Sequence, residues 1–194
     1  MANPANRSGE SVGRIELICG PMFSGKSTAL IRKLSAAADG GATVIACKPA
    51  RDTRYATDRI VTHDGAGITA CEITGADDLL GRARDADVVG IDEFHFFDMP
   101  VVDACIAMAD EGKRAICAGV DLDHRGEMFD VMEAVSKKAD DVERLTATCA
   151  ACGAVATFTQ RLVESDDRIV VGGAGDYEPR CESCFDRGSA KGSR

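Results

Sequence analysis

The chain has 194 residues, of which 45% are hydrophobic, and its net charge is −9 at pH 7. This length allows one α/β core with a small appendage and excludes two large domains. No apolar run approaches the roughly 18 residues of a membrane-spanning helix, and the first residues lack the hydrophobic centre of a secretory signal. The acidic balance disfavours a broad grip on nucleic acid. We therefore expect a cytoplasmic protein with neither a membrane nor a nucleic-acid partner.

The first predicted element is a strand from Ile15 to Cys19, which runs straight into a glycine-rich segment and then a helix. The segment consists of Gly20, Pro21, Met22, Phe23, Ser24, Gly25, Lys26 and Ser27. It fits G-x-x-x-x-G-K-[ST], in which backbone N–H groups and a helix N-terminus surround phosphate, the lysine reaches the β and γ oxygens, and the serine hydroxyl binds Mg²⁺. We predict a site for ATP with Mg²⁺; the alternative is a chance match in a surface turn.

Strands and helices alternate beyond this loop, which predicts parallel pairing in one α/β sheet. The first helix should run from Lys26 to Ala38 and end at a left-handed glycine cap, Gly40 or Gly41. Further strands are expected at 43–47, 68–73, 87–91, 114–120 and 142–148, and further helices at 76–84, 99–112 and 128–137. The polar segment 48–67 is expected to be a loop near the phosphates.

Two acidic residues, Asp92 and Glu93, follow the expected strand 87–91. The carboxyl ends of parallel strands face the ligand crevice, so these carboxylates should lie beside the phosphate loop. Asp92 can hold Mg²⁺ directly or through water, which leaves Glu93 for another task. Alternatively, the two acids merely cap the helix that follows. Another polar loop, 121–126, is expected at the same crevice.

Four of the nine cysteines form two C-x₂-C pairs: Cys149, Cys152, Cys181 and Cys184. Two such pairs can bring four thiolates together tetrahedrally around a structural Zn²⁺. A redox-active dithiol or unligated cysteines are the alternatives. The chain between the pairs is expected to form a hairpin of 154–163 with 168–171. The other cysteines stand singly in apolar segments and are expected in the core: Cys19, Cys47, Cys71, Cys105 and Cys117.

Further short motifs occur in order along the chain: Asp52-Thr53-Arg54-Tyr55, Thr62-His63-Asp64, Ile91-Asp92-Glu93 with Phe96-Phe97, Thr159-Gln160-Arg161-Leu162, and Gly172-Gly173 before Tyr177. With the glycine-rich loop and the paired cysteines, they resemble the type II thymidine kinases, the cytosolic zinc-containing class, over about Gly13 to Phe185. The resemblance implies transfer of the γ-phosphoryl group of ATP to the 5′-hydroxyl of thymidine, or of deoxyuridine, in the salvage that supplies DNA synthesis. It also implies a homotetramer.

The fold implied is α/β: a RecA-like P-loop core with a mostly parallel sheet, plus a small zinc-ribbon-like lobe. The kinase core is expected over 14–148 and the zinc-binding lobe, with a loop that closes over the nucleoside, over 149–185. The ends, 1–13 and 186–194, are expected to be disordered.

The resemblance also implies roles for single residues. Glu93 corresponds to the family's catalytic acid residue, whose carboxylate accepts the proton of the sugar hydroxyl. The nucleotide contacts are carried by Asp52, Thr53, Arg54, Asp92 and His95. The nucleoside contacts are carried by Met22, Phe96, His124, Phe129, Thr159, Arg168, Ile169, Val170, Val171, Gly172 and Tyr177. Judged alone, Arg54 reads as a solvated loop charge, and the aromatic residues and Met22 as core.

Three positions depart from the family pattern. His95 stands for the usual Gln two residues after the catalytic acid, His124 for a Phe that packs on thymine, and Arg168 for an apolar residue at the start of the closing loop. A neutral histidine can still donate one hydrogen bond, but the smaller and more polar ring should weaken stacking. We expect kinase chemistry to persist and nucleoside selectivity to change.

Two other classes of protein fit part of the pattern. One is a P-loop ATPase whose zinc ribbon binds nucleic acid, which the acidic balance and the lack of interleaved basic and aromatic residues over 149–184 disfavour. The other is a non-catalytic zinc scaffold with a vestigial nucleotide site, which would not need an intact Lys26, Ser27, Asp92 and Glu93.

Overall fold

Six strands form the central sheet of the structure, a computed structural model that describes residues 13–50, 59–61 and 67–187. Their order is β5-β2-β6-β7-β1-β8, and every neighbouring pair is parallel. The strands are β1 (Arg14–Cys19), β2 (Val44–Pro49), β5 (Cys71–Ile73), β6 (Val88–Ile91), β7 (Arg114–Gly119) and β8 (Asp141–Arg144). The predicted α/β fold with a parallel sheet is confirmed.

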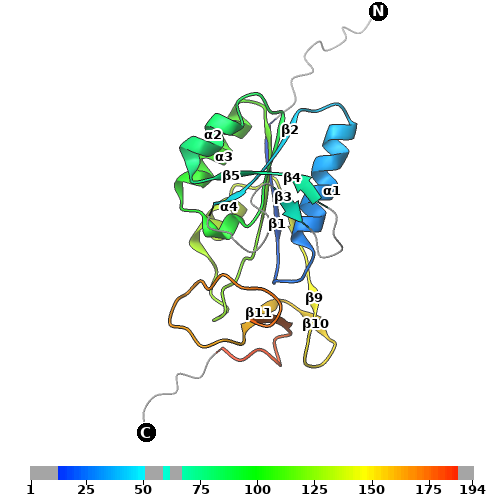
Figure 1. The fold of residues 1–194 in the computed structure, drawn as a ribbon, viewed down its shortest axis with the longest axis vertical. Helices are drawn as coiled ribbons and strands as arrows, with labels where there is room; N and C mark the ends of the chain where they lie inside the picture. The colour runs from blue at the N-terminus through cyan, green and yellow to red at the C-terminus, as the bar shows by residue number, and fades with distance from the viewer. Residues whose placement is uncertain (1–12, 51–58, 62–66, 188–194) are drawn as a thin grey trace, which may run out of the picture.

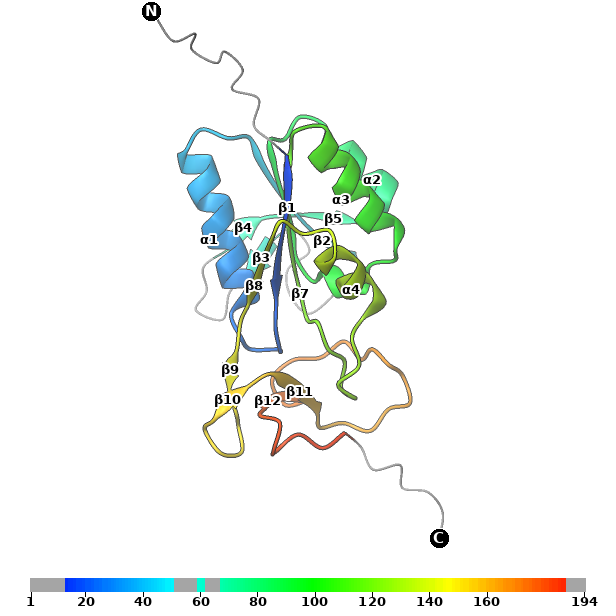
Figure 2. The same ribbon diagram turned by 180° about the vertical axis from the view of Figure 1, so that it is seen from behind.

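Helices cover both faces of this sheet: α1 lies on one side, and α2, α3 and α4 lie on the other (Figures 1 and 2). The helices are α1 (Lys26–Asp39), α2 (Ala76–Arg82), α3 (Pro100–Asp110) and α4 (Asp130–Ser136), with a 3₁₀ turn, η1 (Phe94–Phe96), after β6. No helix in the described ranges is long and apolar enough to cross a membrane.

Because helices cover both faces of the sheet, side chains on both sides of the central strands are buried. The strands are therefore continuously apolar, instead of alternating between apolar and polar residues. All residues of β6 are buried, and so are all but the first of β7. On the α1 side, Leu30 and Leu34 are fully buried one helical turn apart. Gly90 of β6 permits this contact, since a Cβ there would lie 2.5 Å from a methyl carbon of Leu34. The left-handed glycine after α1 is Gly41, with φ of 88°.

The prediction of one strand over 68–73 was wrong, because this stretch contributes to two sheets. Strand β4 (Gly67–Thr69) pairs antiparallel with β3 (Arg59–Val61), whereas β5 joins the central sheet beside β2. The chain changes sheet at Ala70, which is buried. Strand β3 also corrects the prediction that 48–67 is entirely loop, as does β2, which continues to Pro49.

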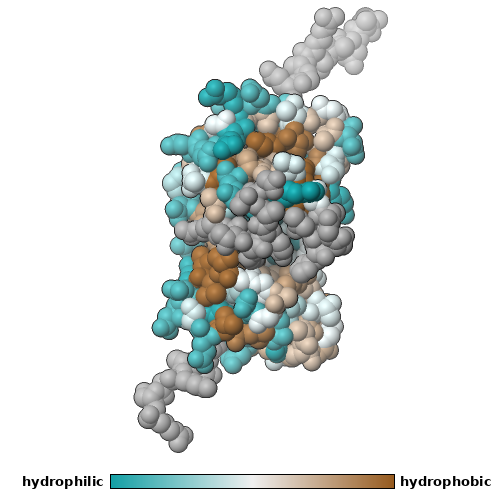
Figure 3. All heavy atoms as spheres, in the orientation of Figure 1, coloured by the Kyte–Doolittle hydropathy of each residue, from teal (hydrophilic) through white to brown (hydrophobic). Residues whose placement is uncertain are grey.

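The prediction of one core strand over 142–148 was also wrong. Strand β8 ends in the central sheet at Arg144, and β9 (Ala147–Thr148) pairs instead with β10 (Val155–Ala156). These strands begin the smaller lobe, at the bottom of Figure 1. Hydrophobic side chains gather on the front of this lobe in Figure 3, and its exposed large hydrophobic residues are Val155, Leu162, Val163 and Val171.

The hairpin of this lobe differs from the predicted one. Strand β11 (Phe158–Arg161) pairs antiparallel with β12 (Tyr177–Arg180), and residues 168–171 form no strand. The physical reason lies in Arg161, whose guanidinium donates hydrogen bonds to the carbonyl oxygens of Ser165 and Asp167. These bonds curl the chain after β11 into a loop. We call residues 164–176 the roof segment.

Candidate active site

The glycine-rich loop joins the carboxyl end of β1 to the first turn of α1. Gly20 has φ of 142°, and a Cβ there would lie 2.3 Å from the carbonyl oxygen of Leu145, so only glycine fits. Gly25 precedes α1 with φ of 84°. Because the first amide groups of a helix have no partner within it, this loop leaves N–H groups available at the crevice.

Lys26 begins α1 and is buried within the loop. Its ammonium group donates a hydrogen bond of 2.6 Å to the carbonyl oxygen of Pro21. Burial lowers the pKa of Lys26, whereas the neighbouring carboxylates of Glu93, Asp92 and Asp121 act to raise it. The lysine thus lies among acidic groups at the point where the loop would meet phosphate.

Asp92 follows β6 and lies against the same loop. Its Oδ2 accepts a hydrogen bond of 2.8 Å from the hydroxyl of Ser27, and its Oδ1 accepts one of 3.0 Å from the amide of Glu93. Burial, and then the charge of Glu93, raise the pKa of Asp92 to about 7. A buried carboxylate beside a hydroxyl is an oxygen donor set that suits Mg²⁺, and a cation there would favour the ionised acid.

Glu93 adopts a left-handed backbone conformation with φ of 50°, which is unusual for a residue with a side chain. Its side chain is 19% exposed and lines a pocket. Oε2 of Glu93 lies 3.6 Å from Nδ1 of His95, but that nitrogen accepts a hydrogen bond of 3.3 Å from the amide of Val120. A ring nitrogen that accepts a hydrogen bond from an amide carries no proton to donate to Glu93, so we assign the proton of a neutral His95 to Nε2.

The pocket beside Glu93 has about 480 Å³ of empty space, including its open mouth. Most residues predicted to contact a nucleoside line it: Met22, Phe96, His124, Phe129, Thr159, Arg168, Ile169, Val170, Gly172 and Tyr177. Val171 does not line it and is 40% exposed. Segments far apart in the sequence therefore meet at one cavity between the core and the smaller lobe.

The lobe is attached to the phosphate loop by a direct hydrogen bond. The amide of Met22 donates to the hydroxyl of Thr159, over 3.0 Å. Within the lobe, the hydroxyl of Tyr177 donates a bond of 2.7 Å to the carbonyl oxygen of Val170, which fixes the main chain of the roof segment. The residues predicted to contact the nucleotide and those predicted to contact the nucleoside are thus linked through hydrogen bonds.

The structure places His95, a predicted nucleotide contact, in the pocket beside Glu93 rather than in the phosphate loop. The ring of His95 lies 4.3 Å from that of Phe96 and 5.2 Å from that of Phe129, and His95 lines the pocket beside Glu93. It therefore belongs to the wall of the cavity formed by the residues that are predicted to contact the nucleoside. Asp52, Thr53 and Arg54 lie outside the described residues.

His124 lines the pocket where the family pattern has Phe. Its Nδ1 is buried and has no hydrogen-bond partner among the described residues. Burial, and then the charge of Arg161, lower the pKa of His124. A lowered pKa favours the neutral form of the His124 ring near pH 7.

The pocket also includes Val120, Leu122 and Asp123, which the sequence analysis did not single out. Asp123 has a clear local role, since its Oδ1 accepts hydrogen bonds from the amides of Arg125 and Glu127. The available signal was an aspartate three residues before Gly126, a common arrangement in tight turns.

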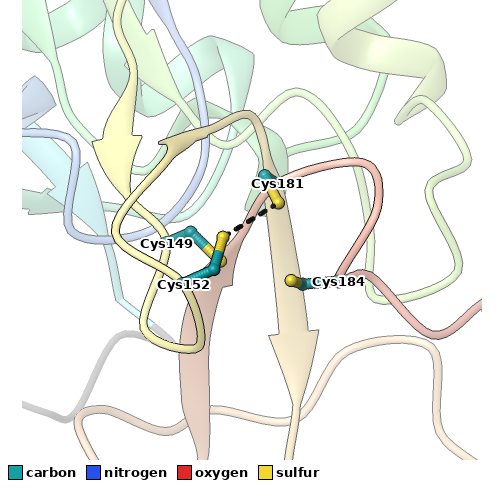
Figure 4. A group of neighbouring side chains, drawn as sticks. All are labelled: Cys149, Cys152, Cys181 and Cys184. Atoms are coloured by element: carbon teal, nitrogen blue, oxygen red, sulfur yellow. Dashed lines mark hydrogen bonds between the residues drawn. The ribbon is translucent and has the colours of Figure 1, made fainter.

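The four paired cysteines converge in the lobe (Figure 4). All four sulfur atoms lie within 4.8 Å of one another, and those of Cys152 and Cys181 are 3.6 Å apart. Tetrahedral zinc with Zn–S bonds of about 2.3 Å requires S···S distances of about 3.8 Å. The cluster, Cys149, Cys152, Cys181 and Cys184, therefore fits a zinc ion.

Comparison with known proteins agrees with this arrangement. Residues 13–185 match the family described as "Thymidine kinase". The thymidine kinase of Rhodothermus sp. is 45% identical over 179 residues, covering 92% of this chain and 84% of that protein. The thymidine kinase of Bacteroides fragilis is 42% identical over 175 residues, covering 90% of this chain and 88% of that protein. The thymidine kinase of Coprothermobacter proteolyticus is 43% identical over 175 residues, covering 87% of this chain and 88% of that protein. The chain therefore belongs to the thymidine kinase family, whose members are phosphotransferases.

Proposed function

We propose that this chain transfers the γ-phosphoryl group of ATP to the 5′-hydroxyl of thymidine, to give thymidine monophosphate in pyrimidine salvage. The observation that carries the proposal is the position of Glu93. Its side chain lines the pocket, while the adjacent Asp92 is hydrogen-bonded to Ser27 of the phosphate loop. Two consecutive residues therefore connect the proposed phosphate site, through Asp92, to the proposed base and the cavity beside it, through Glu93.

The phosphate side of the reaction requires positioning and charge neutralisation. Lys26 and the N–H groups of the loop 20–27 would bind the phosphate oxygens, and Ser27 and Asp92 would hold Mg²⁺. When bound, Mg²⁺ neutralises charge that develops on the transferring phosphoryl group. Asp52, Thr53 and Arg54 are proposed to add contacts to the nucleotide, and His95 a polar contact near Glu93.

The acceptor side requires a group that takes the proton of the 5′-hydroxyl. Glu93 presents its carboxyl group at the pocket wall, and a carboxylate in that position can act as a general base. We propose that Glu93 accepts this proton as the hydroxyl oxygen attacks the γ-phosphorus. The bond from the γ-phosphorus to the β,γ-bridging oxygen breaks at the same time, and ADP leaves with the electron pair. Its strained backbone would hold the carboxylate toward the pocket, at the end of β6.

The nucleoside is proposed to lie between aromatic and apolar side chains and the roof segment. Met22, Phe96, His124 and Phe129 would flank the base, and Thr159 would contact it. Main-chain groups of 168–172 would read its polar edge, and Tyr177 would face the sugar. Backbone readout needs a rigid support, which the zinc site of the lobe would provide. Zinc is proposed to be structural.

Two properties follow from the family resemblance and extend the proposal. We expect the protein to act in the cytoplasm and to assemble as a homotetramer. Size-exclusion chromatography with light scattering of the zinc-loaded protein tests the assembly directly, and a monomeric mass would contradict it.

A panel of acceptors tests the reaction itself. The protein is incubated with labelled ATP and Mg²⁺ and with thymidine, deoxyuridine, deoxycytidine or DNA. Formation of labelled thymidine monophosphate is the expected result. ATP hydrolysis stimulated by DNA would instead indicate a nucleic-acid-dependent ATPase, and the absence of both reactions would indicate a scaffold.

A further inference from the structure

The roof segment (164–176) covers the nucleoside pocket but has little secondary structure of its own. It forms no strand beyond an isolated bridge at Ala174, and Gly172 and Gly173 add backbone freedom near its end. Ile169 packs against the core, yet Val171 is 40% exposed. A segment of this kind needs specific contacts with the core to stay over a cavity.

Arg168 makes such contacts from the middle of the roof segment. Its Nε donates a hydrogen bond of 2.8 Å to Oδ2 of Asp123, and its Nη2 donates one of 3.0 Å to the carbonyl oxygen of Met128. Its guanidinium also lies 5.0 Å from the ring centroid of Phe129. One side chain of the lobe is thus fixed to the core through an ion pair, a second hydrogen bond and a cation–π contact.

Asp123 is a rigid anchor for this contact. Its Oδ1 accepts hydrogen bonds of 2.9 Å and 3.0 Å from the amides of Arg125 and Glu127, which fixes the turn 123–127. The same orientation presents Oδ2 to Arg168. The side chain of Asp123 is 1% exposed and that of Arg168 is 42% exposed. The two bonds to the turn amides do not involve Arg168, so they can hold the carboxylate whether or not the arginine is present. Forming the ion pair therefore requires little further ordering of Asp123, and most of the loss of conformational entropy falls on the Arg168 side chain.

We propose that Arg168 is a positioning residue that fastens the roof segment over the nucleoside pocket through its ion pair with Asp123, and thereby sets the affinity for the nucleoside. The inference rests on the proposed function. Arg168 lines the pocket but is not among the residues that form the phosphate loop or the acid pair. Loss of the ion pair lowers the closed fraction of the roof, which weakens binding in proportion and leaves the transfer step intact once the nucleoside is bound.

Four variants test the proposal: Arg168→Gln, Arg168→Lys, Asp123→Asn and the double variant Arg168→Gln/Asp123→Asn. Asparagine can keep the bonds to the turn amides while it turns its NH₂ group toward Arg168. Arg82→Gln is the matched control, because Arg82 also pairs with an aspartate, Asp78, but on the remote helix α2. Thermal melting of each variant checks that it is folded.

Kinetics provide the first measurement. We expect Arg168→Gln and Asp123→Asn each to raise the KM for thymidine about tenfold, while kcat and the KM for ATP change less than about twofold. The KM of the double variant for thymidine should be similar to that of either single variant, because both substitutions remove the same ion pair; independent effects would multiply. Arg168→Lys should raise the KM for thymidine less than Arg168→Gln does, since lysine keeps the positive charge but lacks the several N–H donors of the planar guanidinium group. An unchanged KM in Arg168→Gln, or a fall in kcat alone, would overturn the proposal.

Hydrogen–deuterium exchange without substrates provides a measurement independent of catalysis. Amides of 164–176 should exchange faster in Arg168→Gln and Asp123→Asn than in the unchanged protein or in Arg82→Gln. Equal exchange in all of them would overturn the fastening role. If exchange changes as expected but the unchanged protein phosphorylates no thymidine, the proposed function and the effect on thymidine affinity fail, while the contact between roof and core stands.

Discussion

The hydroxyl of Ser27 donates a hydrogen bond of 2.8 Å to Asp92, although the two residues follow different strands. Ser27 lies after β1 and Asp92 after β6, and β7 lies between those strands in the sheet. The glycine-rich loop therefore reaches across one strand to meet the acid. This contact brings the proposed phosphate site next to Glu93, which lines the proposed nucleoside pocket.

Replacing the proposed base should abolish most turnover without removing nucleotide binding. Glu93→Ala and the isosteric Glu93→Gln each remove the proton acceptor, and we expect kcat to fall by at least about 100-fold. Steady-state kinetics measure this loss, and calorimetric titration with ATP should show that the nucleotide still binds. Near-normal turnover of either variant would rule out Glu93 as the base.

Replacing His124 by the aromatic residue of the family pattern should strengthen nucleoside binding. Phenylalanine adds stacking area worth about 0.5–1.5 kcal/mol and removes the buried Nδ1 that has no described partner. We therefore expect His124→Phe to lower the KM for thymidine by about two- to tenfold at similar kcat. An unchanged Michaelis constant would mean that this side chain does not stack on the base.

Removing a cysteine of the cluster should release zinc and lower the thermal stability of the lobe. For Cys184→Ala we expect zinc content to fall from about one ion per chain, together with a lower melting temperature and a higher KM for thymidine. Atomic absorption and thermal melting measure both effects. Cys71→Ser is the matched control, because Cys71 lies in β5, outside the cluster, and should keep its zinc. Full zinc loading of Cys184→Ala would contradict the assignment.

Ionisation of Glu16 should make the free energy of unfolding depend on pH in the acidic range. Burial acts to raise its pKa, but hydrogen bonds from Arg114 and Lys33 outweigh burial and lower the pKa to about 2 from 4.5. A carboxyl with a depressed folded-state pKa stabilises the fold above pH 4.5, and this contribution is lost as the pH falls toward 2.

Glu16→Gln tests this dependence, because glutamine keeps the shape and removes the charge. We expect a clearly lower melting temperature than that of the unchanged protein at pH 7 and a difference that shrinks between pH 4.5 and pH 2. Melting curves over this range measure it, with Glu133→Gln, an exposed acid on α4, as the control. A difference that does not depend on pH would show that shape rather than charge is responsible.

The parts of the fold that could be predicted are those with a local pattern. The glycine-rich loop between β1 and α1, the acids after β6 and the cysteine spacing each specify structure within a few residues. The short strands could not be predicted, since β3, β4, β9 and β10 have two or three residues and no periodicity to detect. The partner of β11 depends on Arg161, whose bonds to later carbonyl groups have no signature in the sequence.

The same distinction applies to the pocket. Its predicted residues came from motifs that the family shares, and most of them line one cavity. The ion pair of Arg168 with Asp123 joins positions 45 residues apart, and a long-range contact between one arginine and one aspartate leaves no local pattern. The sequence indicated that Arg168 departs from the family pattern, but the anchor it uses required the structure.

The central claim is that this chain phosphorylates the 5′-hydroxyl of a nucleoside held against Glu93. The most direct measurement is the position of the phosphate in the product, determined by phosphorus–proton NMR after incubation with ATP, Mg²⁺ and thymidine. We predict phosphate on the 5′ oxygen alone, and no transfer to 5′-deoxythymidine. Phosphate on the 3′ oxygen, or no nucleoside monophosphate from the zinc-loaded protein, would contradict the account.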